Sequence, residues 1–252
     1  KAVTGRSSSD DPNGQNYPKR GKKAKAYRKM FVPPPDCYVI EVDLSQAELR
    51  IAACMSGDRT MIDIYNRNGD IHKATALIVA GVTQAQFDAL PREEQKKLRQ
   101  KAKAVNFGFL YGMGWRKFIA YAKTEYNVEF TEKEAQRIRV EFFKKYRSLS
   151  RWHEAMRGFA QEHKFVRSFS GRIRHLPMID SPEEYIQQEA GRQAINSPVQ
   201  EFGSSLGVMS QGRMNEELDP EPMQIVGFIH DAIVAYVKKE YLDWGMRTIK
   251  HY

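Results

Sequence analysis

Apolar and polar positions along this 252-residue chain follow two different periods in different regions. Residues 37–44, with the sequence CYVIEVDL, have the apolar content of a buried strand. Residues 59–160 are mostly helical by pattern, whereas residues 224–239 form two apolar runs separated by His230-Asp231. The second pattern predicts a β-hairpin with a carboxylate at its tip. The chain is therefore expected to mix helices with a sheet.

Helix start signals divide the long helical region. Pro91 is predicted to be the first residue of a helix, because its missing N–H has no intrahelical partner at that position. Thr131 and Glu134 have the spacing of a capping box ahead of another long helix. Ser45 and Glu48 have the same spacing directly after the first strand, which predicts a helix that begins with Ser45 as its N-cap.

The chain carries an excess of positive charge. Lys and Arg total 40 and Asp and Glu total 31, so the formal net charge is +9. Such an excess favours an anionic partner, which can be a nucleic acid, a nucleotide or an acidic membrane surface. Seven of the eleven residues at 19–29 are Lys or Arg, and Tyr27 and Phe31 lie nearby. A solvated charged face and a segment that faces nucleic acid both fit this run, and the aromatic neighbours favour the second.

The two cysteines and the hydropathy pattern exclude several classes of protein. Cys37 and Cys54 form neither a CxxC pair nor a Cys/His cluster with zinc spacing. The sequence has no signal-peptide pattern and no run of about 18 apolar residues. We therefore expect a protein of a reducing compartment, without a disulfide scaffold, and neither secretion nor membrane insertion.

Four side chains recur at four-residue spacing on the helix after Pro91. They are Arg99, Lys103, Phe107 and Tyr111. Steps of four residues drift only about 40° around a helix, so all four share one broad face. Two cations followed by two aromatics suit a triphosphate with a base or sugar on the ring. Snorkelling cations beside a half-buried aromatic patch fit the spacing slightly better, so the pattern alone leaves both interpretations open.

Two carboxylates stand where strands end. Asp43 ends the first strand, and Asp231 lies at the tip of the predicted hairpin. Mg²⁺ in proteins is held by one or two carboxylates together with substrate phosphates, so two such residues brought together could serve a metal-dependent phosphoryl reaction. Asp is also a common turn residue, and spacing alone does not pair the two.

The motifs around these residues settle the choice by resemblance. VDLSQAELR at 42–50, RQKAKAVNFGFLYG at 99–112 and FIHDA at 228–232 resemble motifs A, B and C of family A DNA polymerases, the bacterial polymerase I family, in the family's order. Four further segments resemble other stretches of that family: TGRSSSDDPNGQNYP at 4–18, GDIHKATA at 69–76, GRIRHLP at 171–177 and RQAINSPVQ at 192–200.

The resemblance implies a fold and a division into domains. The fold class is α/β in the mixed (α+β) sense, a right-hand palm of antiparallel sheet with a helical fingers insertion. Residues 1–58 and 179–252 would form the palm, and residues 59–178 the fingers. The thumb and the exonuclease domain are not recognisable in this sequence, so further polymerase segments or chains are expected as partners.

The resemblance also implies a role for each motif residue. Asp43 and Asp231 would be catalytic carboxylates that bind two Mg²⁺ ions, for which Mn²⁺ can substitute, with the backbone carbonyl of Leu44 as a further metal ligand. The deoxynucleoside triphosphate would be bound by Arg99, Lys103, Phe107, Tyr111, His72, Glu48 and Gln46, with Glu48 as a steric gate against a ribose 2′-hydroxyl. Primer–template DNA would be bound by Arg6, Arg192, Asn196, Gln200 and His230.

One residue departs from the family pattern. Ala232 stands where motif C usually has Glu, which removes a second carboxylate next to Asp231. One alternative is a single-subunit phage-type RNA polymerase, which has a similar palm with metal-binding carboxylates. A second alternative is a non-catalytic DNA-binding fragment of a split polymerase. Glu48 and Phe107 favour a DNA polymerase over the first alternative. The joint presence of Asp43, Lys103 and Asp231 argues against the second.

Overall fold

A computed structural model of the chain describes residues 5, 8–11, 13–15, 22–229 and 231–252. The chain divides into two compact units. We call Lys1–Ala47 with Gln200–Tyr252 the sheet unit, and Glu48–Val199 the helical unit. Among the described residues, no helix is both long and apolar enough to cross a membrane.

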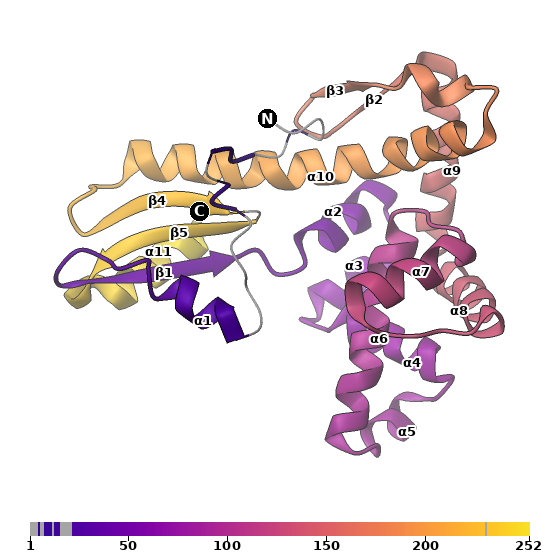
Figure 1. The fold of residues 1–252 in the computed structure, drawn as a ribbon, viewed down its shortest axis with the longest axis horizontal. Helices are drawn as coiled ribbons and strands as arrows, with labels where there is room; N and C mark the ends of the chain where they lie inside the picture. The colour runs from indigo at the N-terminus through magenta and orange to yellow at the C-terminus, as the bar shows by residue number, and fades with distance from the viewer. Residues whose placement is uncertain (1–4, 6–7, 12, 16–21, 230) are drawn as a thin grey trace. The chain divides into compact units, whose positions relative to one another are not determined.

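The sheet unit is built on three antiparallel strands, β1 (Cys37–Asp43), β4 (Met223–Ile229) and β5 (Ala232–Lys238), in the order β1-β5-β4 (Figure 1). The strands β4 and β5 form the predicted hairpin, with Ile229 opposite Ala232 and Asp231 in the connection. The unit also contains α1 (Lys22–Arg28), the 3₁₀ turn η2 (Lys239–Tyr241) and α11 (Leu242–His251).

One face of this sheet carries the core of the unit. Successive strand residues point to opposite faces, so Ile40 faces the same side as its partner Ala235, and both are buried. Met214 from the long helix α10 (Glu184–Glu217) and Ile249 from α11 pack into the same cluster. The residues of β1 that point to the opposite face include Asp43, which is exposed. The prediction of a buried strand at 37–44 is therefore wrong in its burial, because β1 is an edge strand and Ile40 is its one buried residue.

The helical unit contains the segment that the sequence predicts to be helical. Its helices are α2 (Ala47–Ser56), α3 (Arg59–Asn66), α4 (Ile71–Ala80), α5 (Gln84–Asp88), α6 (Arg92–Leu110), α7 (Trp115–Tyr126), α8 (Glu132–Lys145) and α9 (Arg147–His163). A small antiparallel pair, β2 (Phe165–Arg167) and β3 (Ile173–His175), and the 3₁₀ turn η1 (Pro177–Asp180) follow. The helix α10 begins in this unit and continues into the sheet unit, with Pro198 inside it.

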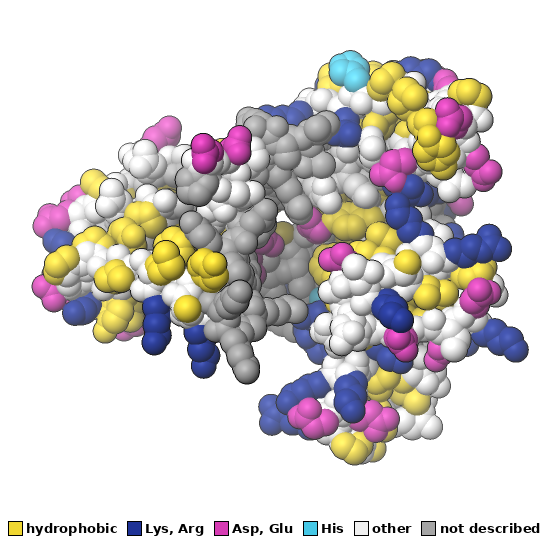
Figure 2. All heavy atoms as spheres, viewed as in Figure 1, with side chains coloured by type: hydrophobic (Ala, Val, Ile, Leu, Met, Phe, Trp, Pro, Cys, Tyr) yellow, Lys and Arg dark blue, Asp and Glu magenta, His cyan; other side chains and the backbone are white. Residues whose placement is uncertain are grey.

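Aromatic side chains fix the position of α6 among its neighbours. Phe109 is fully buried, and its ring centroid lies 4.5 Å from that of Phe118 on α7 and 5.6 Å from that of Phe142 on α8. Such pairs add stability beyond the area they bury. On the face that Figure 2 draws, Lys and Arg side chains lie among acidic ones over the helices of this unit.

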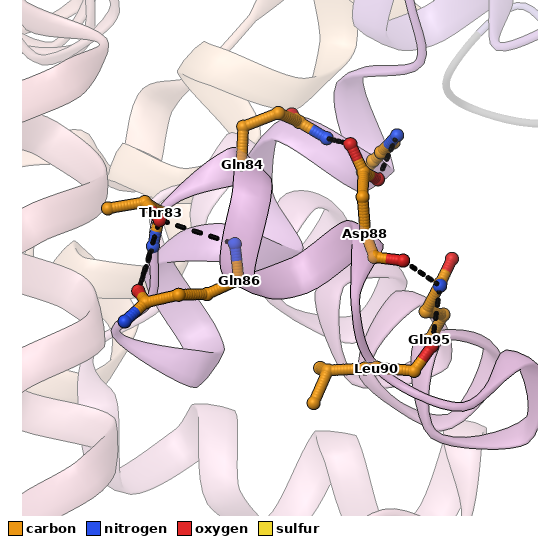
Figure 3. Close-up of polar contacts among 7 residues, drawn as sticks. Thr83, Gln84, Gln86, Asp88, Leu90 and Gln95 are labelled. Atoms are coloured by element: carbon orange, nitrogen blue, oxygen red, sulfur yellow. Dashed lines mark hydrogen bonds and ion pairs between the residues drawn. The ribbon is translucent and has the colours of Figure 1, made fainter.

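The start signals are confirmed in part. Thr131 and Glu134 form the predicted capping box of α8. A second capping box, which is not predicted from the sequence, joins Thr83 to Gln86 at the start of α5 (Figure 3). Pro91 is the N-cap of α6 and precedes its first residue, so the predicted start is one residue early.

The predicted capping box at Ser45 is wrong. The helix α2 begins at Ala47, and Ser45 and Gln46 form a turn before it. Gln46 has a φ of 57°, in the left-handed region that a helix does not use. The helix therefore starts one residue later than a Ser45 N-cap requires, although Glu48 still lies in its first turn.

A polar connection anchors the N-terminal end of α6. Gln95 donates hydrogen bonds from Nε2 to the carbonyl oxygens of Leu90, at 2.8 Å, and Asp88, at 3.4 Å (Figure 3). The Asp88 carboxylate in turn accepts a hydrogen bond from Gln84 and pairs with Lys73 of α4 at 2.8 Å. These contacts link the short α5 to both α4 and α6.

Candidate active site

Strand pairing brings the two predicted metal carboxylates into neighbouring positions in the sheet unit. Asp43, the last residue of β1, pairs with Ala232, the first residue of β5. One step further, the backbone N–H of Leu44 donates to the carbonyl oxygen of Asp231 at 3.2 Å. Both carboxylate residues are exposed. Asp43 and Asp231, which are 188 positions apart in the sequence, therefore lie on adjacent chain segments. Asp231 directly precedes Ala232, the residue that pairs with Asp43.

The donor set at these strand ends fits a metal that is shared with a substrate. Among the residues that the structure describes, no group of three or more His, Cys, Asp or Glu side chains could hold a metal ion. Mg²⁺ is typically held by one or two protein carboxylates, and phosphate oxygens and water complete its coordination shell. The two exposed carboxylates here, with the backbone carbonyl of Leu44, match that number. The residues present therefore fit Mg²⁺ held jointly with the phosphate oxygens of a bound ligand, and not a closed protein site.

The register also explains what Ala232 changes. Residues directly opposite in antiparallel strands project to the same face, so the Ala232 side chain shares the face of Asp43. Ala232 is only 1% exposed. A Glu at this position would stand beside Asp43, whereas this chain places a small apolar group there.

The predicted stripe of cations and aromatics lies on α6 in the helical unit. Arg99, Lys103 and Phe107 are half-buried positions of the helix, and Tyr111 is its buried C-cap residue. The Nε of Arg99 donates to Oδ2 of Asp70 at 2.6 Å. Burial alone would raise the pKa of Asp70, but hydrogen bonding and charge from Arg99, with the His72 amide, hold that pKa below its usual value.

His72 lies at the start of α4, beside this stripe. Asp70 is the N-cap of α4, and its Oδ1 accepts a hydrogen bond from the His72 backbone N–H at 2.9 Å. The His72 ring is 3% exposed, and its centroid lies 6.1 Å from that of Phe107. Burial lowers the pKa of His72 to about 4, with Arg99 and Lys103 acting in the same direction and Asp70 opposing them. The imidazole is therefore neutral at pH 7.

A buried relay of hydrogen bonds orients the His72 ring. Asn106 Nδ2 lies 2.8 Å from His72 Nδ1, and because an amide nitrogen only donates, Nδ1 accepts and the proton resides on Nε2. Thr75 donates to Asn106 Oδ1 at 2.8 Å, and the Tyr146 hydroxyl lies 3.3 Å from the Thr75 oxygen. Four of these residues are not among the site residues predicted from the sequence: Asp70, Asn106, Thr75 and Tyr146. Asp70 ahead of an apolar helix, as an N-cap signal, was the one clue available.

The predicted gate residue contacts the end of the stripe. The Tyr111 hydroxyl donates a hydrogen bond to Oε2 of Glu48, which lies in the first turn of α2. Gln46, the other predicted nucleotide-site residue of this segment, is half-buried in the turn before α2.

Three of the predicted DNA-contact residues recur at four-residue spacing along α10, so they follow one side of that helix. Arg192 Nε donates to Glu189 at 3.0 Å, and the Oδ1 of Asn196 is buried without a hydrogen-bond partner in the described part of the chain. Gln200 is half-buried. Arg6 and His230 lie outside the described residues.

Known proteins resemble the chain over its whole length. The family described as DNA polymerase family A matches residues 1–252. DNA polymerase I of Lactococcus lactis subsp. lactis is 34% identical over 242 residues, which are 95% of this chain and 26% of the relative. The thermostable DNA polymerase I of Thermus aquaticus is 30% identical over 98% of this chain and 28% of the relative. A DNA polymerase of Bacillus phage SP01 is 29% identical over 99% of this chain and 27% of its own length.

A solved structure shares the fold. It is the POL domain of Pol1 from M. smegmatis in complex with DNA primer–template and dNTP, and it matches 99% of this chain and 42% of its own with a TM-score of 0.85 at 24% identity. The predicted fold class is thereby confirmed. The chain spans about a quarter of the length of the curated relatives it matches. From the match over all of its residues, this chain belongs to DNA polymerase family A.

Proposed function

We propose that this chain is the palm and fingers portion of a DNA-directed DNA polymerase, which adds deoxynucleotides to the 3′ end of a primer. The observation that carries the proposal is the strand register that sets Asp43 and Asp231 side by side. Family membership and the cluster around Arg99 and His72 support it. In this proposal the palm comprises residues 1–58 and 179–252, and the fingers residues 59–178.

Asp43, Asp231 and the carbonyl of Leu44 would hold two Mg²⁺ ions, with Mn²⁺ as a substitute. When bound, such a pair of ions stabilises negative charge on the attacking and leaving oxygens of an in-line displacement. The role of the protein at these strand ends is to hold the two carboxylates at fixed positions. Their place on paired strands supports that task, because the sheet hydrogen bonds restrain both backbones.

Arg99, Lys103 and His72 would bind the triphosphate of the incoming nucleotide. Asp70 engages Arg99 through Nε, so the terminal Nη donors of the same guanidinium can face phosphate oxygens. The neutral His72, with its proton on Nε2, would donate one hydrogen bond without adding charge. Pre-set donors of this kind stabilise the charge that develops on a transferring phosphoryl group.

The remaining contacts would position the nucleotide and the DNA. Phe107 would stack on the nucleotide, Tyr111 and Glu48 would enclose the sugar, and Gln46 would support the nucleotide site. Primer–template DNA would contact Arg6, Arg192, Asn196, Gln200 and His230. Minor-groove contacts by such side chains read a nearly degenerate pattern, which suits an enzyme that must accept every sequence. Further polymerase segments, a thumb and an exonuclease, would be partners of this portion.

Primer extension in Mg²⁺ tests the proposal. The protein is incubated with a labelled primer–template and either deoxy- or ribonucleoside triphosphates, with and without candidate partner chains. We expect template-directed extension with deoxynucleotides. Extension with ribonucleotides alone would favour an RNA polymerase. DNA binding without any extension, with all partners present, would favour a non-catalytic fragment.

A further inference from the structure

Three arginines line one cavity within the helical unit. The cavity has a volume of about 390 Å³, and Arg139 of α8, Arg157 of α9 and Arg192 of α10 contribute to its wall, with Gly112, Gln161 and Gln188. We call it the arginine pocket. Of these three arginines, only Arg192 is predicted from the sequence to contact a ligand.

The arginine pocket has more positive charge than its protein partners neutralise. No salt bridge joins Arg139 or Arg157 to a carboxylate among the described residues. Glu189 pairs with Arg192 but also lies 3.5 Å from the Nζ of Lys117, so one carboxylate serves two cations. Burial lowers the pKa of Arg157, and the charges of Arg139 and Arg192 act in the same direction, against Glu154. Like charges held together in this way bind an anion favourably.

Glycine backbone at two positions makes room for the Arg157 side chain. A Cβ at Gly112, where φ is +68°, would lie 2.9 Å from Nη2 of Arg157 and 3.0 Å from Ile195. A Cβ at Gly191 would lie 3.6 Å from Nε of Arg157. The guanidinium therefore packs against the chain directly after Tyr111 on one side and against α10 on the other. Arg139 is fixed separately, with its guanidinium 5.2 Å from the centroid of the Phe143 ring.

The lining favours a phosphodiester over a base. Its members are Gly, Arg and Gln side chains with Ile179, and no aromatic ring is among the described residues that line it. A base bound to single-stranded sites normally stacks on an aromatic face, whereas guanidinium groups bind phosphate oxygens in pairs. The amide groups of Gln161 and Gln188 add neutral donors for phosphate or sugar oxygens.

We propose that the arginine pocket binds a backbone phosphate of the single-stranded template just beyond the nucleotide site, with Arg139 and Arg157 as its principal ligands. The inference rests on the proposed function. The place of the pocket in the chain supports the choice of strand. The pocket includes Gly112, which follows Tyr111. It also includes four residues of α10 that precede the predicted duplex contacts Asn196 and Gln200, namely Gln187, Gln188, Gly191 and Arg192.

Binding measurements on two DNA forms test this inference. Arg139→Gln and Arg157→Gln are compared with the wild type and with Arg151→Gln, a matched change of an exposed arginine on α9 that does not line the pocket. Fluorescence anisotropy gives the affinity for a primer–template with a 5′ template overhang and for the same duplex with blunt ends. We expect each pocket variant to bind the overhang DNA about tenfold more weakly, a loss of about 1.4 kcal/mol, with blunt DNA unaffected. The slope of log affinity against log salt should also decrease by about one.

The controls separate the possible failures. Thermal unfolding of Arg157→Gln at or above the wild-type temperature shows that the fold is intact, because the change removes charge repulsion. If the pocket and control variants bind overhang DNA equally well and the wild type extends primers, this inference is overturned while the proposed function stands. Equal losses on blunt and overhang DNA would assign the arginines to the duplex and also overturn it. A third result would also overturn the inference: inorganic pyrophosphate stabilises the wild type but not Arg157→Gln, and the affinity for overhang DNA is the same in both proteins. A wild type that neither binds nor extends DNA would contradict the proposed function itself.

Discussion

The hydroxyl of Tyr111 donates a hydrogen bond to the carboxylate of Glu48, 63 positions earlier in the sequence. Tyr111 ends the α6 stripe that carries Arg99 and Lys103, and Glu48 lies in the first turn of α2. The pair therefore joins motif A to motif B within the helical unit. A carboxylate held in this way has little freedom to move aside, which is the property a steric gate requires.

Glu48→Ala is expected to admit ribonucleotides. In the wild type, a ribose 2′-hydroxyl would have to displace the Glu48 carboxylate from Tyr111 or remain without a hydrogen-bond partner. An unsatisfied polar group costs roughly 1–3 kcal/mol, and steric displacement adds to that cost, so a discrimination of about a hundredfold or more is expected. The measurement is the ratio of incorporation efficiencies for deoxy- and ribonucleotides in the wild type and the variant.

Tyr111→Phe separates the hydrogen bond from the bulk of the gate. The ring remains, and Glu48 loses only the hydrogen bond from Tyr111, so we expect discrimination to fall by less than in Glu48→Ala. A wild-type ratio near one, or a ratio that neither change alters, would contradict the gate role and favour the RNA polymerase alternative.

Asp43→Asn and Asp231→Asn are each expected to abolish extension while primer–template binding stays close to normal. Each tenfold loss of rate corresponds to about 1.4 kcal/mol of barrier, and a displaced metal costs several times that amount. Glu41→Gln is the matched control, because Glu41 is an exposed carboxylate on β1 two residues before Asp43 and on the same face. Near-normal extension by either Asp variant would exclude the two-metal assignment.

Lys103→Ala is expected to raise the nucleotide concentration needed for half-maximal rate and to slow the chemical step, with little change in DNA affinity. The reason is its position between Arg99 and Phe107 on one face of α6. Lys97→Ala, on another side of the same helix, should change neither quantity. Loss of DNA binding with an unchanged nucleotide response would mean that the stripe faces DNA.

Local periodicity allowed much of this structure to be predicted. The strand β1, the hairpin and the single-helix placement of Arg99, Lys103 and Phe107 each depend on residues close together in the sequence. The Ser45 capping box failed because the turn at Gln46, with its positive φ, delays the start of the helix by one residue. A motif of correct composition does not encode that backbone change.

The relay that orients His72 could not be predicted in the same way. It joins Thr75 to Asn106 across 31 positions and to Tyr146 across 71. Each of these residues on its own is an ordinary polar position of a helix. Only the packing of α4 against α6, with Tyr146 at the end of α8, reveals that they form one buried network. The arginine pocket is of the same kind, since three helices supply one guanidinium each.

Gly108→Ala is expected to destabilise the helical unit. A Cβ at this position of α6 would lie 2.7 Å from Cδ2 of Phe118 and 3.6 Å from Tyr121, so α7 would have to shift. Overpacking of this kind costs about 1–3 kcal/mol. Gly158 of α9 is the control, because a Cβ there meets nothing within 4 Å, and Gly158→Ala should stabilise by about 0.5–1 kcal/mol. Urea unfolding of both variants gives the two free energies, and equal values would mean that α6 and α7 are not in close contact.

The stability of the protein is expected to fall as the pH drops below about 6.5, with His153 responsible for part of the loss. His153 is 3% exposed, and its Nε2 donates to the carbonyl oxygen of Leu110 at 2.9 Å. Burial, reinforced by the charges of Arg157 and Arg139, lowers its pKa to about 3. Between the ordinary pKa of about 6.5 and the folded value of about 3, the unfolded chain binds a proton that the folded chain does not, so the free energy of unfolding decreases as the pH falls. The slope for one such group approaches about 1.4 kcal/mol per pH unit.

His153→Gln keeps a donor for Leu110 but cannot titrate. The free energy of unfolding of this variant should therefore fall less steeply with decreasing pH than that of the wild type. The measurement is urea unfolding between about pH 7.5 and about pH 5, a range that brackets the ordinary histidine pKa of about 6.5. His72, whose pKa is lowered to about 4, titrates in the same direction in both proteins and leaves the difference in slope unchanged. Parallel curves for the two proteins would show that His153 binds its proton equally well in the folded and unfolded chains.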